Sequence, residues 1–374
     1  MARFAALPTP TSPPVGTPLS DEAAMRLALA WAEQAIGLSD PNPRVGCVLL
    51  DASGGFVGAG HTQAAGQAHA EVMALRQAAE RGLAVRGGTA IVTLEPCAHH
   101  GRTPPCCDAL LAAGIARAVI AVEDPNPLVG GQGLARMAAA GVTITRGVLA
   151  DEAAALNVGF LHRMRTGRPW VRMKWAASLD GFTALPDGTS RWITGPEARR
   201  DGQWWRRRAG AVLTGIGTVL ADDPRLDVRD WPTARQPLRV VLDTAGRLRP
   251  EARVLASPGD CLHVHGPHGS AVGDAWCAPL DATGRIDGAA VLAELGRRGV
   301  NELHIEAGAK LNGAWLAAGW VNELLVYIAP KLLGQGRGVA ASPFAWPLDD
   351  AHRWHWLECT PVGADLRLRL QAPG

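Results

Sequence analysis

The chain has 374 residues, 47% of them hydrophobic, which is enough for two domains with separate cores. A formal net charge of +2 offers no basic field for nucleic acid, and no apolar run reaches the roughly 18 residues that a membrane-spanning helix needs. Seven cysteines, an odd number with two of them adjacent, argue against a disulfide framework and predict a cytoplasmic protein.

The first part of the chain predicts alternating helices and strands. Residues 1–18 are rich in Pro and Thr and lack the apolar segment of a signal peptide, so we predict a disordered extension. Ser20 caps a first helix that ends before Gly37, and further helices are expected to begin at His69, at Cys106 and near Gly133. Strands are expected at 45–50, 56–60, 89–93, 117–122 and 142–146. This alternation predicts a layered α/β domain over residues 19–147.

Three side chains of this domain carry the donor atoms of a zinc site. His69, Cys97 and Cys106 would give zinc three ligands and leave the fourth tetrahedral position for water, as catalytic sites do. Cys107 is a rival for Cys106, but only one of two adjacent side chains can readily face the metal. We predict Cys106, which opens a helix whose N-terminus favours the thiolate. The donors favour zinc, although iron or cobalt would also suit them.

Glu71 follows the histidine by two residues, in the first turn of a helix expected over 69–81. Two thiolates cancel the charge of the ion, and the pKa of a bound water falls from about 15.7 toward roughly 7. A carboxylate at this place can take the proton of the water, pass it to a ring nitrogen and later protonate departing ammonia, as in the zinc deaminases. We therefore predict that Glu71 is a catalytic proton shuttle and not a ligand. The alternative is a surface-helix histidine and two buried structural cysteines.

The spacing of the cysteines narrows the class of deaminase. Base and nucleoside deaminases usually place two residues between them, whereas eight lie between Cys97 and Cys106. The sequence closely resembles the bacterial bifunctional deaminase-reductases of riboflavin biosynthesis over residues 94–106, 41–46, 58–61 and 123–127. The resemblance implies a cytidine-deaminase-like three-layer domain. It also implies a pocket for a pyrimidine that carries ribose 5-phosphate, lined by Asn42, His61, Arg102, Asp124 and Asn126. Turn formation before Pro would by itself also explain Asn42 and Asp124.

The second half of the chain begins after a predicted linker. Residues 148–169 are expected to form a linker helix, over 151–165, and a polar junction. A second α/β domain is expected over 170–374, with a first strand at 170–176 and later strands at 323–329 and 364–370. Only two glycines of a G-x-G-x-x-G motif are present, Gly215 and Gly217, so the dinucleotide fingerprint is incomplete. The residues alone therefore predict an α/β domain whose glycine-rich turns could approach phosphates.

Residues 174–181, 191–194, 218–224 and 306–308 look like the reductase half of the same family. The resemblance implies a dihydrofolate-reductase-like α/β fold with NADPH as cofactor. The matching NADP contacts are Ala176, Trp192, Thr218, Asp222, Thr244, Gly308, Ala309, Lys310, Leu311, Asn312, Gly313 and Ala314. The matching substrate contacts are Ser190, Arg206, Leu226, Arg229 and Glu306. Lys174 is also predicted to bind the substrate, through a hydroxyl group, and the alternative for it is an exposed lysine at a strand end. Arg206 and Arg229 suit a phosphate through bidentate hydrogen bonds, while packing in the core is the alternative for Trp192.

The two resemblances together imply a bifunctional enzyme of riboflavin biosynthesis, with one zinc ion per chain and NADPH. It is expected to deaminate 2,5-diamino-6-(5-phosphoribosylamino)pyrimidin-4-one and then to reduce the ribosyl group of the product to a ribityl chain. The resemblance also implies a homo-oligomer that binds only small molecules. Two alternatives remain: a deaminase whose second half has lost reduction, and a zinc-stabilised binding protein without turnover. Glu71 argues against the last, because a structural zinc site needs no adjacent carboxylate.

Overall fold

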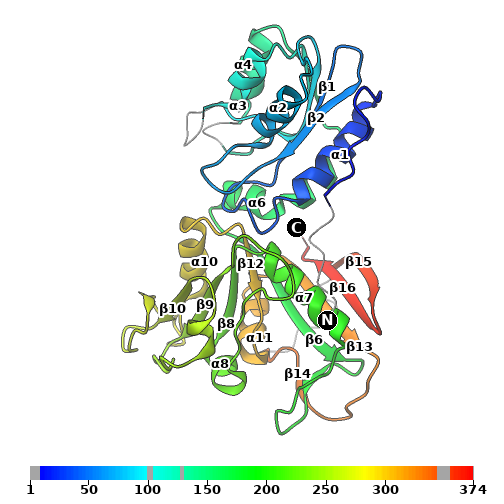
Figure 1. The fold of residues 1–374 in the computed structure, drawn as a ribbon. Helices are drawn as coiled ribbons and strands as arrows, with labels where there is room; N and C mark the ends of the chain where they lie inside the picture. The colour runs from blue at the N-terminus through cyan, green and yellow to red at the C-terminus, as the bar shows by residue number, and fades with distance from the viewer. Residues whose placement is uncertain (1–8, 99–103, 127–129, 343–353, 374) are drawn as a thin grey trace. The chain divides into compact units, whose positions relative to one another are not determined.

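Residues 9–98, 104–126, 130–342 and 354–373 are described in the computed structural model of the chain (Figure 1). The chain divides into two compact units, Met1–Gly167 and Arg168–Gly374, and each is built around its own sheet. The expected fold class, two successive α/β domains, is confirmed. Among the described helices, none is both long and apolar enough to cross a membrane.

The first unit contains a five-stranded sheet in the order β2-β1-β3-β4-β5. Strand β1 pairs antiparallel with β2 and β3, whereas β4 is parallel to both β3 and β5. The three central strands are buried along most of their length, as expected of strands covered by helices on both faces. The strands are β1 (Gly46–Leu50), β2 (Phe56–His61), β3 (Thr89–Leu94), β4 (Arg117–Val122) and β5 (Thr143–Arg146).

Helices cover both faces of this sheet and complete three layers. On one face, Ala24, Met25 and Ala28 of α1 pack against the strands, and Ala153 of α5 joins them. On the other face, apolar side chains of α2, α3 and α4 pack with Leu161 of α6. The helices are α1 (Asp21–Glu33), α2 (Ala70–Glu80), α3 (Cys106–Ala112), α4 (Gln132–Ala139), α5 (Ala150–Leu156) and α6 (Val158–Thr166).

The segment before α1 is partly tied to the sheet. Residues 1–8 lie outside the described residues, but the amide of Gly16 donates to the carbonyl of Phe56 (2.8 Å) and the amide of Phe56 donates to the carbonyl of Thr17 (2.9 Å). Pro18 forms an antiparallel bridge with Gly55. Residues 16–18, the last of the predicted disordered extension, are therefore held in place by backbone hydrogen bonds, which no local sequence pattern predicts.

The helix expected over 151–165 is broken at Asn157, which lies between α5 and α6. The Asn157 side chain accepts a hydrogen bond from the amide of Arg44 (2.8 Å) and donates one to the carbonyl of Arg44 (2.8 Å). The side chain thus satisfies the backbone of a loop far away in the sequence. Both helices fall within the first compact unit, which ends at Gly167.

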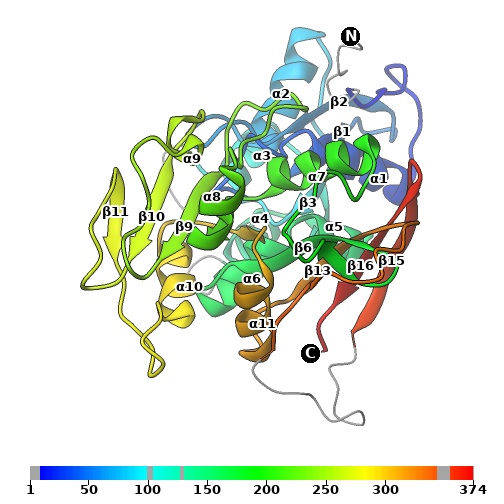
Figure 2. The same ribbon diagram turned by 90° about the horizontal axis from the view of Figure 1, so that it is seen from below.

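The second unit contains a nine-stranded sheet in the order β11-β10-β9-β8-β12-β6-β13-β16-β15, and its two ends are seen in Figure 2. The strands from β11 to β13 are parallel, and β16 and β15 continue the sheet antiparallel. The strands are β6 (Trp170–Ser178), β8 (Ala211–Gly215), β9 (Leu238–Asp243), β10 (Cys261–His265), β11 (Asp274–Cys277), β12 (Glu302–Ile305), β13 (Glu323–Ala329), β15 (His355–Val362) and β16 (Asp365–Gln371). A small separate sheet joins β7 (Phe182–Ala184) and β14 (Arg337–Gly338).

Helices also flank this second sheet. Val291, Leu292 and Leu295 of α10 and Trp315 of α11 pack in its main core, whereas Trp205 of α7 packs on Leu325 and contributes to a separate core cluster. The helices are α7 (Pro196–Arg208), α8 (Ile216–Asp222), α9 (Arg253–Ala256), α10 (Gly288–Arg297) and α11 (Ala309–Ala317).

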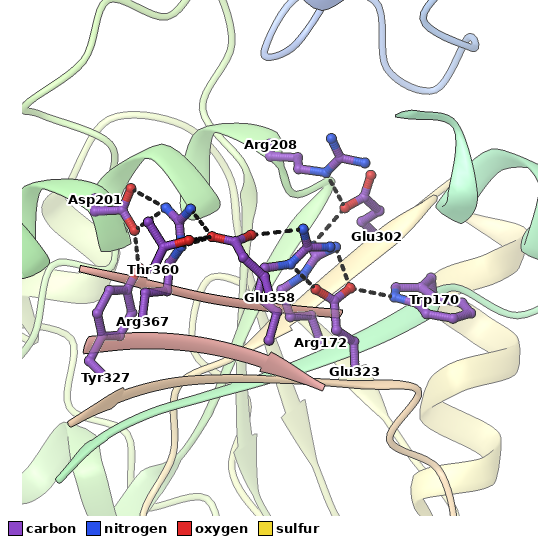
Figure 3. A network of polar contacts seen from close by, with 11 residues as sticks. Trp170, Arg172, Asp201, Arg208, Glu302, Glu323, Tyr327, Glu358, Thr360 and Arg367 are labelled. Atoms are coloured by element: carbon purple, nitrogen blue, oxygen red, sulfur yellow. Dashed lines mark hydrogen bonds and ion pairs between the residues drawn. The ribbon is translucent and has the colours of Figure 1, made fainter. Parts of the chain in front are cut away.

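A network of charged side chains lies between α7 and strands β6, β12, β13, β15 and β16 (Figure 3). At its centre, the buried Arg172 donates to Glu302 (2.8 Å) and to Glu323 (2.8 Å), and its guanidinium lies 4.6 Å from the ring centre of Trp205. Burial alone would raise the pKa of Glu323, but Arg172 and then Arg369 hold it at about 2. The network pairs four guanidinium groups with four carboxylates: Arg172, Arg208, Arg367 and Arg369 with Glu302, Glu323, Glu358 and Asp201.

Replacing Arg172 by methionine is expected to destabilise the second unit by about 3–5 kcal/mol, because two buried carboxylates lose their shared cation. The wild-type Glu323 carboxyl has a lowered pKa, so its stabilisation is present above pH 4.5 and is lost as the pH falls toward 2. In the variant the pKa of Glu323 rises, and the loss of stability should therefore be larger at pH 8 than at pH 5. Denaturant unfolding at pH 5 and at pH 8 measures this loss of stability. Replacing the half-exposed Arg229 by methionine is the control, and an equal loss there would contradict the prediction.

Candidate functional sites

The three predicted metal ligands come together at the start of two helices. His69 is the N-cap residue of α2, Cys106 is the first residue of α3, and Cys97 follows β3. Nδ1 of His69 lies 3.2 Å from Sγ of Cys106 and 3.6 Å from Sγ of Cys97. Ligand atoms held at about 2.0–2.3 Å from a tetrahedral zinc ion are roughly 3.5 Å apart. The positions and the donor types therefore fit zinc.

The contact between Cys97 and Cys106 shifts their pKa values in opposite directions. The hydrogen bond with Cys106 lowers the pKa of Cys97 to about 4, and the same contact raises the pKa of Cys106. The amide of Cys106 also donates to Sγ of Cys97 (3.3 Å). A thiolate is thus available before a metal binds, and a cation would displace the second proton. Cys107 packs in the core instead, where burial raises its pKa to about 11.

Glu71 lies in the first turn of α2 and is only 3% exposed. Burial, and next the charge of Cys97, raise its pKa to about 7. A carboxyl group that titrates near neutral pH can both accept and release a proton during a reaction. The geometry therefore places a group suited to proton transfer beside the metal ligands.

A cavity of about 500 Å³ adjoins this cluster, which is within the size range of small-molecule sites. Its lining includes the predicted substrate contacts Asn42, Asp124 and Asn126 as well as His69, Glu71 and Cys97. Sequence reasoning missed a further part of the wall, which comes from Phe160, Arg163 and Met164 of α6. These residues lie in the segment that the sequence suggested was a linker, and no motif marks them.

Two predicted substrate contacts are not among the lining residues. Arg102 lies outside the described residues. His61 stacks on Trp31, with 5.8 Å between ring centres, and burial lowers its pKa. Its buried Nδ1 has no hydrogen-bond partner within the described part of the chain.

Glu95 positions the loop that carries Asp124 and Asn126. Its carboxylate accepts backbone hydrogen bonds from Asp124 (3.2 Å), Gly131 (2.9 Å), Gly133 (3.0 Å) and Leu134 (3.3 Å). The last two amides belong to the first turn of α4, where a negative charge is also favoured by the helix dipole. A Cβ atom at Gly133 would lie 2.1 Å from the carbonyl oxygen of Pro96, so glycine is required for this close approach.

Replacing Glu95 by glutamine is expected to destabilise the first unit by about 2–4 kcal/mol, because an amide nitrogen would face backbone donors that need an acceptor. Asp124 and Asn126 should also lose their fixed positions, so the KM for deamination should rise. Thermal unfolding and the KM of ammonia release measure these effects. The control is Glu123→Gln. Glu123 directly precedes Asp124 in the loop, and its exposed carboxylate is paired with Arg146. Equal behaviour of the two variants would contradict the prediction.

In the second unit, the predicted NADP contacts gather along one edge of the sheet. Ala176 is near the carboxyl end of β6, and Thr218, Thr244 and Gly308 follow β8, β9 and β12. These strands are parallel neighbours, so their carboxyl ends lie along the same edge. Residues 309–314 form the beginning of α11, whose free amides suit a phosphate. A Cβ atom at Gly215 would lie 3.2 Å from Cδ1 of Leu311, so the turn before α8 packs closely against the first turn of α11.

Trp192 and Asp222 belong to segments beside this edge. Trp192 is 62% exposed, so packing in the core is not its role, and the guanidinium of Arg199 lies 4.4 Å from its ring centre. The carbonyl of Asp222 accepts a hydrogen bond from Arg191 (3.2 Å), the residue before Trp192. This contact joins the end of α8 to the segment that carries the tryptophan.

The predicted substrate contacts of the second unit form a charged cluster around Glu306. Arg206 donates to both carboxylate oxygens of Glu306 (2.5 and 3.0 Å), and Nζ of Lys174 lies 3.7 Å from one of them. Burial alone would raise the pKa of Glu306, but Arg206 and Lys174 hold it well below its usual range. The guanidinium of Arg206 is thus already paired with Glu306, and a phosphate would have to displace that carboxylate.

Three other predicted contacts have different surroundings. Asp227 links the cluster to Arg229, because its carbonyl accepts from Arg206 (3.1 Å) and its carboxylate accepts from Arg229 (3.0 Å). Leu226 is buried and has a positive φ of 54°. Ser190 is half-buried between β7 and α7 and makes no hydrogen bond to this cluster within the described residues.

The two halves match two family models. Residues 18–122 match the cytidine and deoxycytidylate deaminase zinc-binding region, and residues 169–363 match the RibD C-terminal domain. The chain is 45% identical to the riboflavin biosynthesis protein RibD of Escherichia coli K12, over 94% of this chain and 99% of that protein. The chain belongs to the RibD family. RibD of Mycobacterium tuberculosis H37Rv is 41% identical, over 94% of this chain and 98% of that protein.

Solved structures of RibD proteins share the fold. RibD of Acinetobacter baumannii, in its form 1, is 40% identical with a TM-score of 0.85, covering 95% of this chain and 99% of that one. The Thermotoga maritima structure titled as a diaminohydroxyphosphoribosylaminopyrimidine deaminase and 5-amino-6-(5-phosphoribosylamino)uracil reductase is 30% identical with a TM-score of 0.86, covering 94% and 99%. Membership of the RibD family confirms the expected cofactors, zinc in the first half and NADPH in the second.

Proposed function

We propose that this chain is a bifunctional enzyme of riboflavin biosynthesis that deaminates 2,5-diamino-6-(5-phosphoribosylamino)pyrimidin-4-one and then reduces the product, 5-amino-6-(5-phosphoribosylamino)uracil, with NADPH. The observation that supports it most directly is the His69, Cys97 and Cys106 cluster beside a buried Glu71, in a chain that continues into a RibD C-terminal domain. We assign deamination to residues 19–147 and reduction to 170–374, with a junction at 148–169 whose helix α6 also lines the deaminase cavity.

For deamination, zinc supplies the Lewis acidity that makes water a competent nucleophile near neutral pH. His69, Cys97 and Cys106 would hold the ion. Glu71 would take a proton from water and deliver it to the ring nitrogen, and it would then carry a second proton from the added hydroxyl group to the departing ammonia. Asn42, Asp124 and Asn126 orient the pyrimidine in the cavity, and His61 and Arg102 complete the proposed substrate contacts.

For reduction, bound NADPH would supply a hydride to C1 of the ribosyl group. The C1–O bond of the ring would break, and its oxygen would take up a proton from solvent to give the ribityl chain. Thr218, Thr244 and the start of α11 hold the cofactor, together with Ala176, Trp192 and Asp222. Lys174 and Glu306 face the substrate, and Arg206 fixes the carboxylate of Glu306. Ser190, Leu226 and Arg229 are the remaining proposed substrate contacts. We also propose a homo-oligomer in the cytoplasm, where the seven free cysteines would stay reduced.

A paired assay tests the proposal. Purified zinc-loaded protein is given the diamino-pyrimidinone substrate and NADPH, and ammonia release and NADPH oxidation are followed in the same reaction. Ammonia followed by an equimolar amount of oxidised NADPH is expected. Ammonia without NADPH oxidation would indicate a deaminase whose second half has lost reduction, and neither signal would indicate a binding protein.

A further inference from the structure

Helix α6 is held firmly against the substrate loop of the first unit. Asn157, just before α6, exchanges two hydrogen bonds with the backbone of Arg44, and Nη1 of Arg44 donates to the carbonyl of Leu156 (3.1 Å). Leu161 is buried in the core of the same unit. Arg44 closes the loop that carries Asn42, so this loop and α6 form one rigid frame. The face of α6 that lines the cavity, Phe160, Arg163 and Met164, is called the α6 wall below.

The described lining of the cavity has more acidic than basic side chains, whereas a phosphorylated ligand needs a positive charge. Its described lining contains three carboxylates, Glu71, Glu95 and Asp124, and the zinc ligands neutralise the charge of their own ion. Among the described lining residues, Arg163 is the only arginine or lysine. A phosphate carries up to two negative charges at neutral pH and binds best to a guanidinium, through two parallel hydrogen bonds. Among these lining residues, Arg163 is therefore the side chain that can neutralise part of the phosphate charge.

The surroundings of Arg163 suit this task. Its side chain is half-buried, and burial lowers its pKa while the nearby Asp40 raises it, so the guanidinium is partly desolvated but stays charged. Phe160 and Met164, one turn or less away, give the cavity an apolar surface beside this charge. A partly desolvated cation next to an apolar wall interacts more strongly with an anion than an exposed one does.

We propose that Arg163 binds the phosphate of the deaminase substrate, so that α6 is the element by which the first unit selects a phosphorylated pyrimidine. This inference rests on the proposed function, because it assigns a contact within the same deamination site. The pyrimidine lies toward Glu71 and the metal ligands, and the ribose 5-phosphate extends toward the α6 wall. The charge of Asp40 also acts on this guanidinium, and the phosphate would take over part of that interaction.

The test compares ammonia release from the phosphorylated substrate and from the same compound without its phosphate. Arg163→Met is expected to lower kcat/KM for the phosphorylated substrate about 10- to 100-fold, the size of a lost charge-assisted hydrogen-bond pair, and to leave the dephosphorylated substrate unchanged. Inhibition by ribose 5-phosphate should weaken by a similar factor. Arg165→Met, which removes an exposed arginine two residues further along the same helix, should change neither quantity. Arg163→Lys should restore part of the preference.

The outcomes separate this inference from the proposed function. If the wild-type protein deaminates neither compound, the proposed function fails. If it deaminates the phosphorylated compound but Arg163→Met lowers both substrates equally, Arg163 is a structural partner of Asp40 and the inference is overturned. It is also overturned if Arg102→Met removes the whole preference for phosphate while Arg163→Met removes none. NADPH oxidation with the uracil intermediate should be unaffected by Arg163→Met, which shows that the second unit remains folded.

Discussion

Ammonia release is expected to fall by about 10²- to 10⁴-fold when Glu71 is replaced by glutamine, the range that general acid–base catalysis usually contributes. Glutamine fills nearly the same volume in this 97%-buried position but cannot carry a proton from water to the ring nitrogen. Because Glu71 is not one of the three proposed metal ligands, zinc content should stay at one ion per chain. NADPH oxidation with the uracil intermediate should also remain at the wild-type rate.

The control for this variant is Glu80→Gln, which changes an exposed glutamate at the other end of α2 and should leave deamination intact. Single-turnover ammonia release and zinc analysis measure both proteins. Deamination retained in Glu71→Gln at full zinc content would contradict the role of proton shuttle. Loss of zinc in that variant would show instead that Glu71 helps to hold the metal.

The same variant should change the pH dependence of stability in the metal-free protein. Burial and the Cys97 charge raise the pKa of Glu71 to about 7, so the folded state binds this proton more tightly than the unfolded state does. The resulting stabilisation is complete below pH 4.5 and is lost as the pH rises through 7. Glutamine does not titrate, so urea unfolding in the presence of a chelator should depend less on pH between 5 and 8 in the variant.

Replacing Cys97 by alanine is expected to abolish zinc binding and deamination together. The site loses the thiolate that is formed most readily, since the contact with Cys106 lowers the pKa of Cys97 to about 4. Two remaining ligands hold zinc poorly, and the first unit also loses the stabilisation that metal binding provides. Reduction of the uracil intermediate should persist, because the second unit has its own core and its own site.

Cys107→Ala is the matched control for this experiment. Cys107 adjoins Cys106 in sequence but packs in the core, so its replacement should cost some stability and keep the zinc. Zinc analysis, ammonia release and NADPH oxidation on both variants are the measurements. If Cys107→Ala also lost the metal, the choice of Cys106 over its neighbour would be wrong. If Cys97→Ala lost both activities, the two sites would not be independent.

Much of the fold could be predicted because the local signals were strong. The strands of the first unit are apolar runs bounded by turn residues, and the expected range 117–122 coincides with β4 (Arg117–Val122). Ser20 caps α1 as expected, and its Oγ accepts from the amide of Ala23 (3.2 Å). The break at Asn157 could not be predicted, since its cause is a pair of hydrogen bonds to Arg44, more than a hundred residues earlier.

The metal cluster could also be inferred from sequence, because histidine, cysteine and an adjacent glutamate carry a chemistry that few other arrangements use. The residues that hold the surrounding loops and strands in place could not be inferred in this way. Nothing local distinguishes Glu95, whose four backbone contacts position Asp124, from an ordinary glutamate before a proline. Likewise, Arg172 lies in a strand where a charged residue would normally face water, and its two carboxylate partners come from β12 and β13.

The α/β class of both halves and the grouping of His69, Cys97 and Cys106 beside Glu71 could be predicted from the sequence, since periodicity, capping and donor type are properties of short segments. Which distant groups share a cavity depended on the tertiary structure. It placed α6 in the cavity wall, paired the guanidinium of Arg206 with Glu306, and left Trp192 exposed. The physical reason is that burial, charge pairing and cavity shape depend on contacts between segments far apart in the chain, and these contacts exist only after the sheets have formed.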